Sequence, residues 1–137
     1  MTPSERDELI QAALVAQRRA FCPYSNFPVG AALRTASGTI YQGVNVENAS
    51  FGLTLCAERV AAAAAVAAGD RDFTAIAVAT RGGVSPCGAC RQFLAEFNPN
   101  LPILMVDSSR HDTIHETTLD VLLPGRFEGP TQDGSAI

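Results

Sequence analysis

The chain opens with apolar residues at helical spacing and continues with short apolar runs. Residues 3–20 place alanine and leucine on one helical face, and Thr2-Pro3-Ser4-Glu5 matches a capping box with proline at the first helical position. Two prolines interrupt this pattern in residues 21–28. We therefore predict a helix over residues 3–20 and a loop after it.

Runs of β-branched and small apolar residues farther along predict strands. The first two runs flank a turn that contains Gly38, which favours an antiparallel hairpin. The later two runs are apolar throughout, as is typical of strands buried on both faces of a sheet. The predicted strands are residues 29–34, 39–44, 73–80 and 103–106.

Helical patterns separate and follow these strands, at residues 54–68, 86–97 and 118–123. Two strand-helix-strand units added to a hairpin predict a three-layer α/β/α fold with a mixed sheet of about five strands. In such a sheet the N-termini of the connecting helices lie at one end, where a ligand binds. Residues 60–68 are apolar on every side, which predicts that a neighbouring subunit covers part of this helix.

Composition and charge narrow the possible functions. The 137 residues suit one domain, which we place at residues 1–127, with a mobile tail over residues 128–137. The net charge of −4 disfavours a nucleic-acid partner, because phosphate binding needs clustered basic side chains. All ten basic residues are arginine, so lysine Schiff-base chemistry is excluded. We predict a cytoplasmic protein, because the thiols have metal-binding rather than disulfide spacing and no leader pattern opens the sequence. We also predict no membrane contact, because no apolar stretch is long enough to span a membrane.

Three cysteines have the spacing of a metal site. In Ser85-Pro86-Cys87-Gly88-Ala89-Cys90-Arg91, Cys87 and Cys90 lie one helical turn apart, and Cys56 opens the preceding helix. Three protein ligands leave one position open, which is typical of a catalytic zinc site. Cys22 is the alternative fourth ligand, and we interpret it as a small buried apolar residue.

Three further residues near these cysteines suggest how such a site would work. Glu58 follows Cys56 by two positions, which suits a proton carrier for metal-activated water. Arg59 and Arg91 lie on the same helical faces as their cysteines, so we predict that both offset the thiolate charge from the second shell. His111 and His115 share the spacing of paired ligands, but their segment is polar and we interpret them as solvated.

Together these motifs resemble the zinc-dependent cytidine deaminases of the small three-cysteine type, and the resemblance covers nearly the whole chain. It adds the segment around Phe27, the Asn45-Val46-Glu47-Asn48-Ala49 stretch and the Leu122-Leu123-Pro124-Gly125-Arg126-Phe127 segment. The resemblance implies hydrolytic deamination of cytidine and 2′-deoxycytidine to uridine and 2′-deoxyuridine, with one zinc ion per chain. It also implies a small nucleoside substrate, a homotetramer and a place in pyrimidine salvage.

The resemblance also implies roles for individual residues. Phe27 would lie against the pyrimidine ring and the Ala57 backbone would border it, while Asn45 and Glu47 would hold the sugar 3′-hydroxyl. Phe51 and Phe127 would contact neighbouring subunits. Phe51 stands where the family commonly has tyrosine, so a hydroxyl contact across that interface is missing. On the residues alone, Phe27 is also compatible with a place in the core.

Three alternatives stay open on the sequence. A blasticidin S-type deaminase would share the fold and both cysteine motifs, although Asn45, Glu47 and Arg59 argue against it. A non-enzymatic zinc domain would use Cys22 as a fourth ligand. A dithiol redox module would use Cys87 and Cys90, and it would purify without stoichiometric zinc.

Overall fold

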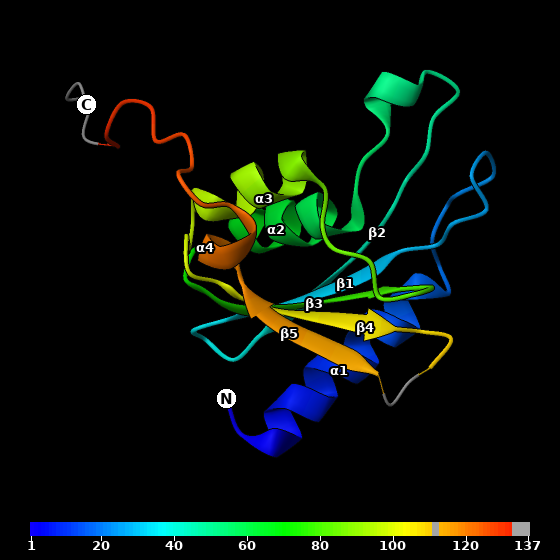
Figure 1. Cartoon of the computed structure of the whole chain (residues 1–137), viewed down its shortest axis with the longest axis horizontal. Coiled ribbons are helices and arrows are strands. Elements are labelled where there is room, and N and C mark those ends of the chain that lie inside the picture. The colour runs from blue at the N-terminus through cyan, green and yellow to red at the C-terminus, as the bar shows by residue number, and fades with distance from the viewer. Residues whose placement is uncertain (111–112, 133–137) are drawn as a thin grey trace.

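A mixed five-stranded sheet forms the centre of the protein, in a computed structural model that describes residues 1–110 and 113–132 (Figure 1). The strand order is β2-β1-β3-β4-β5, in which β3 and β4 are parallel and the other neighbours are antiparallel. The strands are β1 (Gly30–Thr35), β2 (Ile40–Val44), β3 (Phe73–Thr80), β4 (Pro102–Asp107) and β5 (Ile114–Thr118). The helices are α1 (Pro3–Gln17), η1 (Phe51–Leu53), α2 (Ala57–Ala67), α3 (Gly88–Ala95) and α4 (Leu119–Leu122).

Helices cover both faces of this sheet. Helix α1 lies against one face, and α2, α3 and α4 lie on the other (Figure 1). Each interface has its own buried core: Leu9, Ala13 and Leu104 belong to the α1 side, and Ala61, Ile76 and Leu94 to the opposite side. The predicted α/β/α layering with a mixed five-stranded sheet is confirmed.

Two glycines let the helices approach the sheet closely. A Cβ atom at Gly30 would lie 2.2 Å from the backbone oxygen of Ala13 in α1. A Cβ atom at Gly43 would lie 2.2 Å from the backbone oxygen of Ala57, at the start of α2. Contacts this short are sterically forbidden, so each position requires glycine. Gly43 thereby sets the distance between β2 and the first turn of α2.

The first helix and two helix starts differ from the predicted boundaries. Helix α1 begins with the predicted cap, in which the Glu5 backbone N–H donates to Thr2 Oγ1 at 3.1 Å, but it ends at Gln17 rather than at residue 20. Helix α2 begins at Ala57 rather than at residue 54, because Leu55 forms an antiparallel bridge with Val46.

The third helix begins at Gly88 rather than at residue 86. Cys56 and Cys87 are therefore themselves the N-cap residues of α2 and α3, with extended backbones and no side-chain capping bond. The carbonyl oxygen of each cysteine accepts the first hydrogen bond of its helix, from the N–H of Val60 and of Arg91, respectively.

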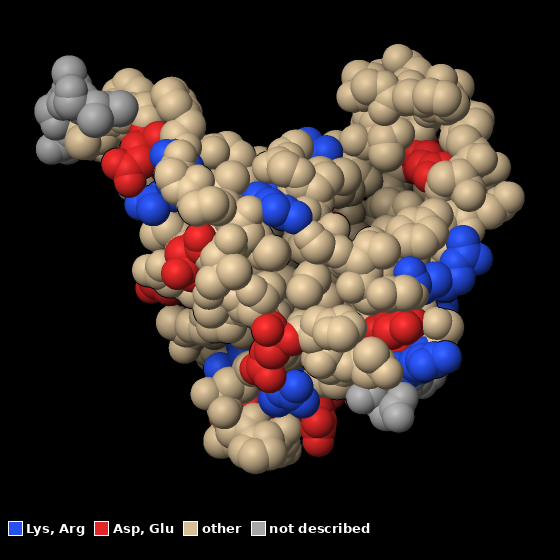
Figure 2. Space-filling model, viewed as in Figure 1, with Lys and Arg blue, Asp and Glu red and all other residues tan. Residues whose placement is uncertain are grey.

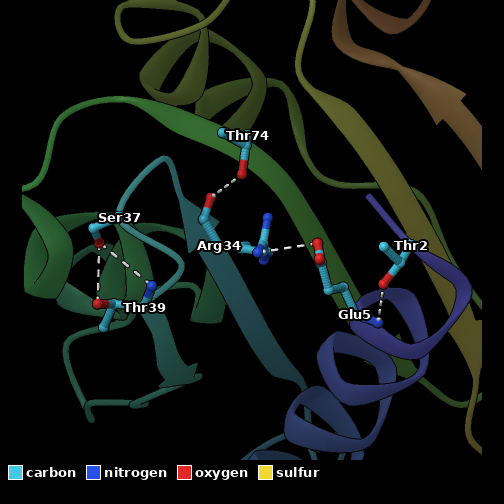
Figure 3. Close-up of polar contacts among 6 residues, drawn as sticks. All are labelled: Thr2, Glu5, Arg34, Ser37, Thr39 and Thr74. Atoms are coloured by element: carbon cyan, nitrogen blue, oxygen red, sulfur yellow. Dashed lines mark hydrogen bonds and ion pairs between the residues drawn. The ribbon is translucent and has the colours of Figure 1, made fainter.

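Polar side chains join α1 to the sheet at the end of β1 (Figure 3). The Arg34 guanidinium lies 3.0 Å from the Glu5 carboxylate of α1, and Thr74 Oγ1 donates to the Arg34 carbonyl oxygen at 3.0 Å. In the adjoining turn, Ser37 Oγ donates to Thr39 Oγ1 at 3.0 Å. Because Arg34 pairs with Ala75 at the start of β3, this network lies far along the sheet from Gly30 and Thr80.

The last part of the chain supplies a strand that the sequence patterns do not locate. Strand β5 pairs with β4, and its residue His115 is exposed. The exposure of His115 agrees with its interpretation as solvated, whereas His111 lies outside the described residues and its interpretation stays a prediction. The predicted short helix is present as α4. In the predicted tail, Gln132 Nε2 donates to Glu96 Oε2 at 2.8 Å, and residues 133–137 are outside the described part.

Across residues 1–110 and 113–132, every helix is too short or too polar to span a bilayer.

Candidate metal centre and substrate pocket

The starts of α2 and α3 meet at one end of the sheet. The chain enters both helices from the side where residues 45–55 project as an arm that carries η1 (Figure 1). Cys56 and Cys87 cap these helices, and Cys90 lies in the first turn of α3. The first backbone N–H groups of each helix have no partner within the helix, and the helix dipole adds partial positive charge there. This environment favours thiolates.

The three sulfur atoms lie close enough to share one metal ion. The Cys56 and Cys87 Sγ atoms are 3.9 Å apart, the Cys87 and Cys90 Sγ atoms are 3.4 Å apart, and all three lie within 4.8 Å of one another. A tetrahedral zinc ion with bonds of about 2.3 Å to sulfur would separate its ligands by roughly 3.8 Å. The donor set therefore fits zinc. Cys22 is half-buried and is not part of this group.

Arg59 contacts the cluster directly. Its Nη2 atom donates to Cys56 Sγ at 3.4 Å, and its buried Nε atom has no hydrogen-bond partner among the described residues. Hydrogen bonds from Cys90 and Arg59, together with the positive charge of Arg59, lower the pKa of Cys56 to about 5. Cys56 thus carries negative charge at neutral pH even before a metal binds. Arg59 offsets that charge from one turn away.

Arg91 acts on the backbone around the cluster instead. Its guanidinium donates to the carbonyl oxygens of Pro86 at 2.8 Å and Leu122 at 2.6 Å, and to Ser85 Oγ at 2.5 Å. All three acceptors are oxygen atoms, whereas the sequence predicts that Arg91 offsets the charge of the sulfurs. It fastens the segment before Cys87 to the end of α4.

Glu58 lies in the first turn of α2 and lines the same cavity as Cys56 and Cys87. Its side chain is 4 % exposed, and this burial raises the pKa of its carboxyl group, with the negative charge of Cys56 acting in the same direction. A carboxyl group whose pKa is raised in this way holds a proton more readily and can pass it to a bound substrate. Its position suits the predicted proton carrier.

A cavity of about 200 Å³ opens above the cluster. Val29, Val78 and Val84 give it apolar walls, and Asn45 and Thr80 add polar groups. A second hollow, lined by Tyr24, Ser25, Glu47, Phe51 and Thr54, shares Thr54 with the first. Both hollows have mainly apolar walls, and we call the second one the polar end because it adds the Glu47 carboxylate. Apolar walls with a few placed polar groups suit a ligand with a flat ring and a hydroxylated part.

The side chains of Asn45 and Glu47 also hold the loop of residues 22–28. Asn45 Oδ1 accepts from the Val29 N–H at 2.9 Å, and its Nδ2 donates to the Phe27 carbonyl oxygen at 2.9 Å. Glu47 accepts from the N–H groups of Tyr24 and Ser25 at 3.0 and 3.1 Å. Hydrogen bonds from Ser25, the hydroxyl foremost, lower the pKa of Glu47. Asn45 is buried, whereas Glu47 is half-buried.

The sequence patterns indicate neither Thr80, which lines the cavity, nor Arg81, which lies outside the residues that line the two hollows. Thr80, the last residue of β3, is buried, and its Oγ1 accepts from the Val84 N–H at 2.8 Å. Arg81 follows it and reaches Phe27, with its Cζ atom 5.4 Å from the ring centroid. The apolar pattern of the strand predicts that Thr80 is buried. It does not predict that Thr80 lines a cavity, because the other walls come from segments elsewhere in the chain. Nothing in the local sequence around Arg81 indicates its partner.

The residues predicted to contact neighbouring subunits are exposed within this chain. Phe51 is 72 % exposed at the tip of the arm and lies edge-on to Tyr24 with ring centroids 5.8 Å apart. Phe127 is 75 % exposed, while its carbonyl oxygen accepts from Gln92 Nε2 at 3.0 Å. Ala57 is fully buried and lines the cavity, where the sequence places it beside a substrate ring.

Comparison with known proteins connects this geometry to one family. Residues 3–105 match the family model described as the cytidine and deoxycytidylate deaminase zinc-binding region. The chain is 49 % identical over 124 residues to a cytidine deaminase of Sporosarcina psychrophila, an alignment that covers 88 % of this chain and 90 % of that protein.

A solved structure and a more distant relative extend the comparison. The crystal structure of cytidine deaminase from Burkholderia pseudomallei superposes with a TM-score of 0.85 at 45 % identity, covering 93 % of this chain and all of that one. A blasticidin-S deaminase of Bacillus cereus is 34 % identical over 110 residues, covering 72 % of this chain and 76 % of that protein. These two cytidine deaminases thus align with more of this chain than the blasticidin-S deaminase does, and at higher identity.

Proposed function

The chain belongs to the cytidine and deoxycytidylate deaminase family and is a zinc-dependent hydrolase of a C–N bond; we propose that Cys56, Cys87 and Cys90 hold the zinc and that Glu58 carries protons. Its reaction is the deamination of cytidine, in which cytidine and water give uridine and ammonia. One observation carries the residue assignment: a buried carboxyl group lines the same cavity as Cys56 and Cys87, two members of the three-sulfur cluster.

The zinc ion, Glu58 and Arg59 each have a distinct task in the reaction. Zinc, when bound, supplies a Lewis acid that lowers the pKa of water and so activates it for attack on ring carbon C4. Glu58 accepts one proton from that water and delivers it to ring N3. It then takes the second proton from the hydroxyl group now on C4 and gives it to the amino group, which departs as ammonia as the C4 carbonyl forms. Burial of Glu58 excludes competing solvent, and Arg59 offsets the negative charge at Cys56.

Other residues bind the nucleoside. Phe27 lies against the base and the Ala57 backbone borders it, while Asn45 and Glu47 hold the sugar 3′-hydroxyl. The side-chain oxygens of Asn45 and Glu47 support this role, because each can accept a further hydrogen bond in addition to those from the loop of residues 22–28. No part of this arrangement depends on the 2′-hydroxyl, so 2′-deoxycytidine is also a substrate.

Assembly into a homotetramer completes the site. The arm of residues 45–55 exposes Val46, Phe51, Leu53 and Leu55, and few charged atoms cover it in Figure 2. A projecting apolar segment of this kind marks a protein interface. Phe51 keeps the ring but not the hydroxyl of the usual tyrosine, so packing rather than a hydrogen bond joins the subunits there. Sedimentation that shows an active monomer at assay concentration would overturn the tetramer.

The cellular setting follows from the chemistry. A small neutral nucleoside is the partner, because the net charge is −4 and acidic and basic side chains are interspersed on the face shown in Figure 2. Free thiols that bind metal suit the reducing cytoplasm. The products place the enzyme in pyrimidine salvage.

One assay tests the proposal directly. Purified protein with one zinc per chain should change the ultraviolet absorbance of cytidine and release uridine and ammonia in equal amounts. A chelator that removes the zinc should stop the reaction, and added zinc should restore it. Turnover of blasticidin S as fast as cytidine would favour the alternative deaminase. Stoichiometric zinc without turnover would favour a non-enzymatic zinc domain.

A further inference from the structure

Arg81 joins two loops that are distant in sequence. Its Nη2 atom donates to the carbonyl oxygen of Asn26 at 2.7 Å, and its Cζ atom lies 5.4 Å from the centroid of the Phe27 ring. The contacts arise because Gly30 pairs with Ala79, which brings the end of β3 beside the residues that precede β1. A guanidinium over an aromatic face at this distance is a cation–π contact.

The backbone on either side of Arg81 is held firmly. The Thr80 carbonyl oxygen accepts from the Ser108 N–H at 2.8 Å, and the Gly82 N–H donates to Asp107 Oδ1 at 2.9 Å. Gly82 has a φ of 86°, a left-handed conformation that favours glycine. Arg81 is therefore an exposed side chain that extends from an anchored backbone, so it can act as a fixed point for the opposite loop.

Hydrogen bonds hold the backbone of Phe27, and its ring contacts Arg81. The Phe27 N–H donates to Ser25 Oγ at 3.0 Å, and its carbonyl oxygen accepts from Asn45 Nδ2 at 2.9 Å. Asn26 adopts a left-handed φ of 53°, which costs energy for a residue other than glycine and must be stabilised by its surroundings. The bond from Arg81 to the Asn26 carbonyl and the contact with the ring provide that stabilisation.

We propose that Arg81 is a positioning residue that holds the Phe27 ring in the orientation that receives the substrate base. The proposal rests on the proposed function, since it takes Phe27 as the contact for the base. Because an oriented ring contributes to binding throughout the reaction, its loss weakens binding more than it slows the chemical step. Arg81 thus determines the affinity for the base without touching the reacting atoms.

Steady-state kinetics of three variants test this role. Arg81→Ala should raise KM for cytidine by about tenfold and change kcat by less than about twofold, with unchanged zinc content and only a small decrease in Tm from the lost support of Asn26. Arg81→Lys keeps the charge but not the planar guanidinium, so it should recover part of the loss. Arg71→Ala removes an exposed arginine from the other end of β3 and should behave as the unmodified protein. An unchanged KM in Arg81→Ala would overturn the proposal, and so would an equal loss of kcat.

A double-mutant cycle and a spectroscopic probe distinguish the loss of ring positioning from a nonspecific loss of activity in Arg81→Ala. In a Phe27→Leu background, Arg81→Ala should have little further effect on kcat/KM, since the ring that it positions is gone. 4-Fluorophenylalanine at position 27 should show a shifted fluorine resonance when Arg81 is replaced by alanine. If the unmodified protein leaves cytidine intact, the proposed function fails, and the fluorine resonance still decides whether Arg81 orients the ring. An unchanged resonance would overturn that contact.

Discussion

The cysteine cluster and the polar end of the pocket are built in different ways. Cys87 and Cys90 lie within one turn of one helix, and Cys56 caps the other helix, so most of the cluster follows from local spacing. The polar end combines the loop of residues 22–28, the arm of residues 45–55 and the turn after β3. Two of the three sulfurs in the cluster thus come from one helical turn. The polar end instead consists of contacts between segments that are far apart in the sequence. The two parts should therefore respond differently to substitution.

The largest effect is expected at the cluster. Cys87→Ala removes one of three ligands, so it should abolish both stoichiometric zinc and turnover, because metal binding and folding are linked at such sites. Cys22→Ala is the matched control and should keep full zinc, since Cys22 lies apart from the cluster. Metal analysis of both purified variants checks this. One zinc per chain in Cys87→Ala would contradict the ligand assignment.

Proton transfer can be separated from metal binding within the same cavity. Glu58→Gln keeps the shape of the side chain but cannot carry a proton, so turnover should fall by about 10²–10⁴-fold while zinc stays bound. Single-turnover kinetics and metal analysis on one preparation would measure both. Near-normal turnover would exclude Glu58 from the mechanism.

A substitution at the polar end should give a smaller, substrate-dependent effect. Glu47→Ala should lower kcat/KM for cytidine by roughly a hundredfold and reduce its advantage over 3′-deoxycytidine, because a polar site penalises a missing hydroxyl. Ser25→Ala removes a hydrogen bond to Glu47 but leaves the carboxylate, so it should preserve discrimination between the two nucleosides. The same loss of discrimination in both variants would assign Glu47 to the loop rather than to the sugar.

The smallest of these effects concerns Arg59, which acts on the cluster through Cys56. Arg59→Gln should weaken zinc binding by about tenfold, measured by competition with a chelator, because partners of metal ligands tune affinity rather than create it. Arg91→Gln should instead lower Tm with a smaller change in zinc affinity, since its guanidinium binds oxygen atoms of Pro86, Leu122 and Ser85. Equal zinc affinities in Arg59→Gln and the unmodified protein would remove Arg59 from the site.

Local patterns predict the layers, the first helix cap and the convergence of the cysteines well. They fail at the starts of α2 and α3, which begin at Ala57 and Gly88 rather than at residues 54 and 86. Leu55 pairs with Val46 in a β-bridge, and these backbone hydrogen bonds override the helical preference of leucine. The same displacement puts Cys56 and Cys87 at the N-cap positions.

The sequence by itself determined the residue types and spacings that make a three-sulfur site with an adjacent carboxyl group, because helical geometry relates residues one turn apart. It also determined the strand-helix alternation behind the mixed sheet. Only the tertiary structure decided that Arg81 reaches Phe27, that Glu47 holds the loop before β1, and that Arg91 binds backbone oxygens instead of sulfur. These contacts join segments far apart in the chain. They depend on strand register and on the close approach of helices at Gly30 and Gly43, which no local spacing encodes.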